Sequence, residues 1–171
     1  MTVRNPKAAA AVALPAAEAG DSAVRVLRRF RVVFNAVKSH FQQVERKSGV
    51  GGAQLWALSV IQAHPDIGVS DLARAMDVHQ STASNLVKAL VAMEMVSAVK
   101  QGRDRRSVQL RLLPAAHRVL SRAPGPFAGV LPQALSRLEA GTLARLDHDL
   151  GVLIAELQAD EEAGNIPLAQ M

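Results

Sequence analysis

The sequence predicts a mainly α-helical fold with a small β-hairpin wing. Two observations predict a winged helix-turn-helix: residues 70–95 carry two successive helical patterns, and residues 96–112 carry an alternating, hairpin-like pattern. A third observation is that long apolar stripes lie on both sides of this unit, which is too small to cover them completely. We therefore expect the winged helix-turn-helix to be joined to a helical dimerisation module formed by the N- and C-terminal helices.

The first helix of the pair is predicted to begin at Ser70 and Asp71, where a serine N-cap and a first-turn acid favour a helix start. Its apolar face consists of Leu72, Ala73 and Met76. Residues 77–80 break the pattern, and a recognition helix is predicted over residues 81–95. The apolar stripe of that helix is formed by Ala83, Leu86, Val87, Leu90 and Met93. Its polar residues share the opposite face, so one side can pack while the other contacts a ligand.

The polar face of the recognition helix suits a DNA duplex. Asn85 can read adenine bidentately, and the methyl group of Thr82 or Ala83 can meet thymine. Hydroxyl and ammonium groups on the same face suit phosphates. The predicted DNA contacts of this helix are Gln80, Ser81, Thr82, Ser84, Asn85 and Lys88.

After Met95 the apolar period changes from helical to alternating. Residues 96–100 and 108–112 are predicted to form the two strands of a hairpin, since Gly102 interrupts them and Val108, Leu110 and Leu112 alternate with polar residues. The tip concentrates three arginines around one carboxylate, which suits phosphates or a narrow minor groove. We expect wing contacts from Arg103, Arg105 and Arg106, with Asp104 stabilising the wing. The alternative is a solvated tip in which Asp104 only pairs with a neighbouring arginine.

The stripe on the N-terminal side of the winged unit is predicted to belong to one long helix. Its members are spaced three and four residues apart: Leu27, Phe30, Phe34, Val37, Phe41 and Val44. The stripe near the other end has the same spacing: Leu143, Leu146, Leu150, Leu153 and Leu157. We expect the two stripes to be buried in a homodimer. The alternative is an intrachain helical pair folded onto the same domain.

These motifs together resemble the MarR family of bacterial transcriptional regulators. The resemblance rests on residues 70–73, 81–90 and 104–110, among which the Asp-x-Arg wing is the most specific, and it covers about residues 21–157. It implies a homodimeric repressor. Because a two-fold dimer presents two recognition helices to successive major grooves, the target is expected to be an inverted-repeat DNA operator.

The resemblance also implies release from DNA by a small aromatic or phenolic ligand, bound where the dimer helices meet the DNA-reading unit. In this sequence Phe34, His40, Arg46 and Trp56 are the candidate effector-binding residues. Each also has a plainer explanation. Phe34 and Trp56 can fill apolar cores, His40 can be a partly exposed neutral side chain, and Arg46 can be a solvated charge.

Composition narrows the class of function. The net charge of +5 and an isoelectric point near 10.4 favour polyanionic partners. The lack of cysteine excludes disulfides and thiolate metal sites, and the five histidines are too scattered for a metal site. No enzyme motif is present, no cofactor is expected, and no apolar run is long enough to span a membrane. We expect a cytoplasmic, nucleoid-associated protein.

The expected organisation has five segments. They are a disordered Ala-rich tail (1–20), an N-terminal dimerisation helix (21–48), the winged helix-turn-helix (53–113), C-terminal linker and dimerisation helices (114–158) and an acidic flexible tail (159–171). The first segment only loosely resembles a secretory signal, because Pro15 interrupts a short apolar run. The rival functional reading is a winged-helix module for protein assembly or non-specific DNA packaging, without operator or effector.

Overall fold

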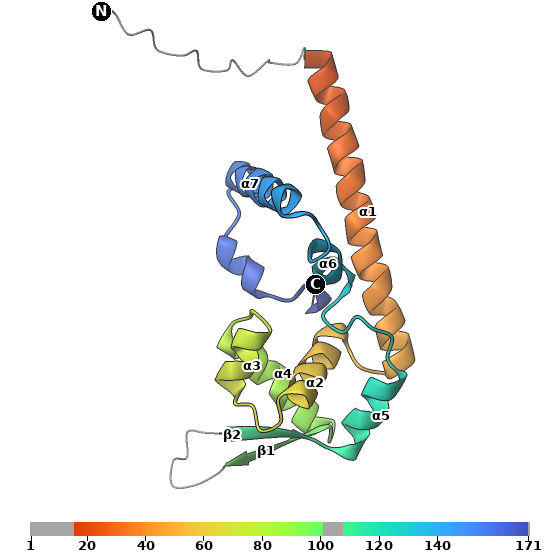
Figure 1. Ribbon diagram of the computed structural model, residues 1–171, viewed down its shortest axis with the longest axis vertical. Coiled ribbons are helices and arrows are strands. Elements are labelled where there is room, and N and C mark those ends of the chain that lie inside the picture. Colours follow the sequence, from red (N-terminus) through yellow and green to blue (C-terminus); the bar gives the residue numbers. More distant parts are fainter. Residues whose placement is uncertain (1–15, 101–107, 171) are drawn as a thin grey trace, which may run out of the picture. The chain divides into compact units, whose positions relative to one another are not determined.

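The computed structural model describes residues 16–100 and 108–170 and divides the chain into two compact units, residues 1–35 and 36–171. The described part of the first unit is the N-terminal portion of helix α1 (Ala16–Ser48), and all later elements belong to the second unit (Figure 1). Helix α1 starts five residues before the predicted position, because Ala16, Ala17 and Ala19 favour helix more strongly than any other residue type. It ends at Ser48, and the following Gly49 has a positive φ of 75° that closes the last turn.

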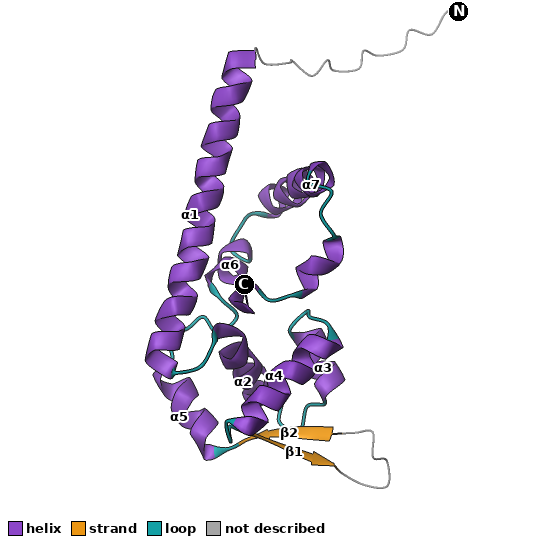
Figure 2. Ribbon diagram, turned by 180° about the vertical axis from the view of Figure 1, so that it is seen from behind, coloured by secondary structure: helices purple, strands orange, loops and turns teal. Residues whose placement is uncertain are grey.

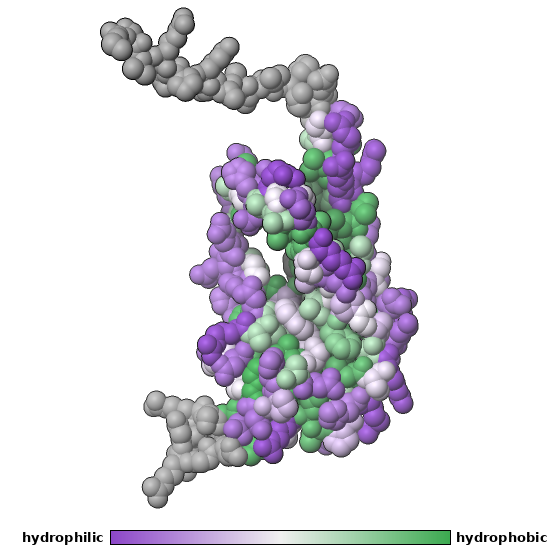
Figure 3. Space-filling view, viewed as in Figure 1, coloured by the Kyte–Doolittle hydropathy of each residue, from purple (hydrophilic) through white to green (hydrophobic). Residues whose placement is uncertain are grey.

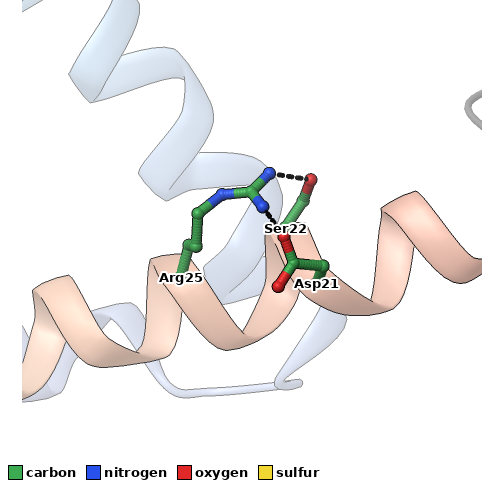
Figure 4. A network of polar contacts seen from close by, with 3 residues as sticks. All are labelled: Asp21, Ser22 and Arg25. Carbon is green, nitrogen blue, oxygen red and sulfur yellow. Dashed lines mark hydrogen bonds and ion pairs between the residues drawn. The ribbon is translucent and has the colours of Figure 1, made fainter.

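In the first unit, polar side chains support the start of α1 while apolar ones are exposed. Arg25 forms an ion pair with Asp21 and donates a hydrogen bond to Ser22 Oγ at 2.7 Å (Figure 4). Hydrophobic surface is visible along this part of α1 (Figure 3). It comprises Val24, Val26, Leu27, Val32, Val33 and Phe34.

The second unit contains the predicted winged helix-turn-helix, which is confirmed. Three helices are followed by one antiparallel hairpin, in which Val96 pairs with Leu112 and Lys100 with Val108 (Figure 2). The elements are α2 (Gly52–Ala63), α3 (Val69–Ala75), α4 (Gln80–Ala92), β1 (Val96–Lys100) and β2 (Val108–Leu112).

Two predicted helix ends were wrong. The N-cap of α3 is Gly68, so Ser70 lies inside the first turn. The recognition helix α4 ends at Ala92 rather than at residue 95, because Glu94 adopts a φ of 56° and the Met95 N–H returns to the Leu90 carbonyl at 2.9 Å. Met93, predicted in the buried stripe, therefore lies outside the helix and is 38% exposed.

One apolar core holds the winged unit together. Helices α2, α3 and α4 and both strands each contribute at least one fully buried side chain to this core. Packing therefore fixes the relative rotation of the three helices. The largest buried side chains are Leu55, Leu58, Ile61, Leu72, Met76, Leu90, Val96 and Leu110. Val44 joins this core from the C-terminal half of α1.

The loop between α2 and α3 is attached to the hairpin. The Asp66 N–H donates to the Leu110 carbonyl at 3.2 Å, and the Leu110 N–H donates to the Ile67 carbonyl at 3.1 Å. Asp66 adopts a φ of 68°, a conformation that aspartate tolerates better than most residues. The wing is therefore anchored to the helix-turn-helix at its own second strand.

The C-terminal region is divided into several elements, most of them short. Helix α5 ends before Pro124, and two further helices and two short 3-10 helices follow (Figure 1). Their bounds are α5 (Pro114–Arg122), α6 (Val130–Leu135), α7 (Ala140–Glu156), η1 (Glu161–Asn165) and η2 (Leu168–Gln170). The segment expected to be an acidic flexible tail (159–171) contains η1 and η2. In this segment Pro167, which precedes η2, is buried, and Ala169 packs against the core.

Helix α7 differs from the other long helices. Of its described residues none is buried, and Leu143, Val152 and Leu153 are between 37% and 54% exposed. In the parts of the chain that the structure describes, no helix has the length and apolarity needed to cross a membrane.

Candidate nucleic-acid interface

The orientation of α4 presents a polar face to solvent. Ala83, Leu86, Val87 and Leu90 are buried in the core, as predicted. On the other side Gln80, Ser81, Asn85 and Lys88 are exposed, while Thr82 and Ser84 are half-buried. The structure therefore gathers the predicted recognition-helix residues on one accessible surface.

One detail of the predicted contacts was wrong, and a second contact is constrained by a local hydrogen bond. Ala83 has no exposed surface, so its methyl group cannot meet a thymine, and Thr82 alone remains for that contact. The Ser84 hydroxyl donates to the Gln80 carbonyl at 2.7 Å, which commits its only proton to the helix backbone. Ser84 can therefore accept a hydrogen bond from a partner but cannot donate one to a phosphate in this rotamer.

An open polar groove lies between the starts of α3 and α4 and the strand β2. Its volume is about 520 Å³. It is lined by Asp66, Gly68, Val69, Ser70, Asp71, Gln80, Ser84, Val108 and Gln109. Asp71 is paired with Arg74 in the same helix, so part of the acidic charge in the groove is balanced locally. The groove connects the recognition helix to the wing strand, and the sequence reading missed it because the contact is tertiary.

An ion pair fixes the wing beside this groove. Arg111 of β2 donates to the Asp66 carboxylate, and this hydrogen bond lowers the pKa of Asp66 below its usual value. Desolvation acts in the opposite direction, and the charge of Arg111 adds to the lowering. The same hydrogen bond and charge raise the pKa of Arg111. Both side chains are well exposed, so the pair orients the hairpin rather than contributing much stability.

The predicted contacts at the wing tip, Arg103, Arg105 and Arg106, and the predicted stabilising residue Asp104 lie outside the described residues. The structure describes the flanking strands β1 and β2, which pair in antiparallel fashion. In the described ranges, no group of three or more His, Asp or Glu side chains could hold a metal ion.

The candidate effector residues are divided between the two units. Phe34 belongs to the first unit, where its ring stacks on Phe30 at a centroid distance of 6.2 Å. Arg46 is exposed in the last turn of α1. His40, for which a partly exposed position was the alternative to an effector role, is only 9% exposed, and its Nε2–H donates to the Pro126 carbonyl at 3.1 Å. Since a carbonyl can only accept, this bond assigns the proton to Nε2.

Trp56 lines a cavity of the second unit. The cavity is apolar and has a volume of about 80 Å³. Its walls come from the C-terminal half of α1, the start of α2, the segment before and within α6, and the C-terminal residues. Trp56 itself is half-buried against the core. We call this cavity the Trp56 crevice.

The fold and the exposed polar helix define a winged helix-turn-helix DNA-binding protein. Residues 48–107 match the sequence profile of the MarR family. The HTH-type transcriptional repressor MdtR of Bacillus subtilis (strain 168) is 21% identical over 132 residues, which cover 77% of this chain and 85% of MdtR. The chain is therefore similar to the MarR family through residues 48–107, and its curated relative MdtR is a transcriptional repressor.

Solved structures show the same fold. A MepR-like protein complexed with pseudoligands superposes with a TM-score of 0.54 at 18% identity, over 76% of this chain and 94% of that protein. The S. aureus MepR–DNA complex superposes with a TM-score of 0.52 at 18% identity, over 75% of this chain and 93% of MepR. At such low identity these likenesses establish the architecture of the chain.

Proposed function

We propose that this regulator is a homodimeric repressor that binds an inverted-repeat DNA operator and is released by a small aromatic or phenolic ligand. The orientation of α4 is the observation that best supports operator binding. Its apolar stripe closes the core, while Gln80, Asn85 and Lys88 face solvent. A helix held in this way can enter a major groove without disturbing the fold. A cytoplasmic, nucleoid-associated location belongs to the same proposal.

The exposed apolar residues support dimerisation. In the α1 stripe, Val37 and Val44 are buried within the chain, whereas Leu27 and Phe34 are 50% and 59% exposed. Helix α7 also exposes Leu143 and Leu153. Intrachain packing therefore accounts for one half of the α1 stripe only, and a second copy of the chain would bury the remainder.

Selection of DNA fragments by the purified protein tests the operator. We expect recovery of an inverted repeat whose half-sites are separated by about 10 bp, the pitch of B-form DNA. The selected site should bind at least about a thousandfold more tightly than bulk genomic DNA at physiological salt. Equal retention of both DNAs would favour the packaging alternative and contradict the proposal.

The wing contributes through its arginines in this proposal. Arg105→Ala should weaken binding to all sequences and reduce the slope of log K against log salt by about one unit for each lost phosphate contact. The size of the slope change separates a phosphate contact from a structural effect. If the protein were instead a protein-assembly module, the same substitution would have little effect on its activity.

The effector is proposed to enter the Trp56 crevice. Sites for drug-sized ligands usually have volumes of about 300–1,000 Å³, so a crevice of about 80 Å³ must open before an aromatic ligand fits. Titration of benzoic acids and phenols against the protein–operator complex tests this. We expect release from DNA together with a change in Trp56 fluorescence, and release without that change would place the ligand elsewhere.

A further inference from the structure

The Trp56 crevice is assembled from segments far apart in the sequence, all within the second unit. Val37, Phe41, Gly52 and Trp56 form one side. Residues 127–132 and residues 167–169 form the other. The C-terminal segment returns to this place after α7 and η1, and η2 lies against α2 (Figure 1).

The fit between the C-terminal residues and α2 is close. A Cβ atom built on Gly52 would lie 3.1 Å from Ala169 Cβ and 2.3 Å from Phe41 Cδ1. Ala169 and the Phe41 ring therefore pack directly on the glycine. Pro167 is buried beside them, whereas Leu168 is 40% exposed. A small alanine and a proline with a preset φ suit such a narrow crevice.

The contacts of this segment with the crevice are apolar. Among the residues that the structure describes, no hydrogen bond joins 167–169 to the crevice, and the nearest polar contact is local, from the Ile166 N–H to the Ala163 carbonyl at 3.2 Å. The preceding residues Asp160, Glu161 and Glu162 are exposed. Packing alone holds the segment, so no hydrogen bond has to break when it leaves.

The segment also closes a loop. Residues 127–132 and residues 167–169 meet at the same crevice, so the chain between them, which includes α7, is held at both ends. Since none of the described residues of α7 is buried, these two attachments contribute to restraining it within the chain. Detachment of one end would leave α7 tethered only through α6.

We propose that Pro167–Ala169 form a detachable strap, an intramolecular ligand of the Trp56 crevice. When the strap is seated, it shields Trp56 and holds α7. When it leaves, it opens an apolar site that accepts a second peptide of the same chemistry. The inference rests on contacts within one unit and does not depend on operator binding, so a failed DNA selection would leave it standing.

Trp56 is the only tryptophan in the chain, so its fluorescence reports on the crevice directly. The experiment uses the full-length chain carrying Ala169→Glu, which drives a carboxylate against Gly52. Ala163→Glu is the matched control, since it adds the same charge at an exposed alanine nearby. We expect the acrylamide quenching constant of Trp56 to rise about twofold in Ala169→Glu through local opening and to stay at the parent value in Ala163→Glu.

A peptide with the sequence of residues 164–171 is then added to the Ala169→Glu chain. We expect the acrylamide quenching constant of Trp56 to return to the parent value as the peptide saturates the site. Saturation should require millimolar peptide, because an intramolecular segment commonly reaches an effective concentration of that order. A scrambled peptide should have no effect. The proposal is overturned if Ala169→Glu quenches like the parent, or if the peptide fails to restore shielding while circular dichroism shows a folded chain. If Ala169→Glu loses its helical signal, Pro167→Ser is used in its place. The same quenching and peptide results then support or overturn the proposal.

Discussion

The ring of Phe41 lies between two glycines and sets how closely α1 and α2 approach. A Cβ atom on Gly52 would come within 2.3 Å of the ring, and one on Gly129 within 3.1 Å. The edge of the His40 ring also contacts it, at a centroid distance of 5.4 Å. Gly129 adopts a φ of 105°, which favours glycine independently of space.

Gly52→Ala should therefore destabilise the protein. The added methyl group would overlap the Phe41 ring, and overpacking of this kind typically costs about 1–3 kcal/mol. Urea unfolding followed by circular dichroism measures the loss. Gly20→Ala is the control, since nothing lies within 4 Å of its Cβ position in α1, and it should be neutral or slightly stabilising. Equal stability of both variants would show that the ring moves aside freely.

The ion pair between Asp66 and Arg111 predicts a pH dependence. Because the folded-state pKa of Asp66 is lowered, the stabilisation is complete above its unfolded-state pKa of about 3.9 and is lost as the pH falls through the folded-state value. The free energy of unfolding of Asp66→Asn should be lower than that of the parent at neutral pH, and the difference should shrink below about pH 4.

Asparagine retains the tolerance of aspartate for positive φ, so Asp66→Asn changes charge and little else. Asp77→Asn is the matched control, because Asp77 is an exposed aspartate with a φ of 50°. A difference between Asp66→Asn and the parent that stays constant from pH 7 to pH 2 would contradict the assigned pKa shift.

The polar residues of α4 are predicted to have separable roles in DNA binding. Lys88→Ala should reduce the slope of log K against log salt by about 0.9, since one phosphate contact is lost. Asn85→Ala should leave the slope unchanged and reduce discrimination at one base pair by about 1–3 kcal/mol. Fluorescence anisotropy with the selected operator and its single-base variants distinguishes them. If Lys88→Ala instead reduced base discrimination and Asn85→Ala reduced the salt slope, the two assigned roles would be reversed.

At the scale of elements, the sequence predicted the winged helix-turn-helix well because periodicity determined which face each element buries. Ala83, Leu86, Val87 and Leu90 were predicted as one stripe and all are buried. Helix ends were less predictable, since they depend on backbone conformations such as the positive φ of Glu94. The strap was missed because Pro167 and Ala169 carry no periodic signal and are defined only by distant partners.

The closed loop around α7 gives a prediction about this element. Ala169→Glu should accelerate tryptic cleavage after Arg145 relative to Ala163→Glu, because a helix attached at one end unfolds locally more often. Arg145 is exposed in the middle part of α7. Mass spectrometry of limited digests measures the rate. Identical rates in the two variants would mean that the strap does not restrain α7.

At the scale of the whole molecule, the sequence predicted which apolar surfaces need a partner. The structure shows that part of this surface is buried within the chain. The α1 stripe was expected to be buried in a dimer, yet Val37 and Val44 are buried within the chain itself. The candidate site was predicted in its recognition helix, whereas the groove formed with Gln109 depends on tertiary contacts. Sequence periodicity specifies a face but does not specify its neighbour.

Dimerisation is tested on α7. Leu153→Glu places a charge in the exposed leucine stripe and should convert a dimer to a monomer with a large loss of operator affinity. His148→Glu is the control, because helical spacing places position 148 opposite the stripe. Analytical ultracentrifugation at micromolar concentration measures both. A parent protein that sediments as a monomer would contradict the proposed dimer.

The attachment of the wing through Asp66 bears on how any survey of arginine substitutions is interpreted. Arg111 lies in β2, close in sequence to Arg103, Arg105 and Arg106, so its removal would weaken DNA binding although its guanidinium is paired with Asp66. Such a loss would mimic a missing phosphate contact in a single-condition assay. The salt dependence of binding separates the two cases. A misaligned hairpin lowers affinity but leaves the slope of log K against log salt unchanged, whereas the loss of a phosphate contact reduces that slope.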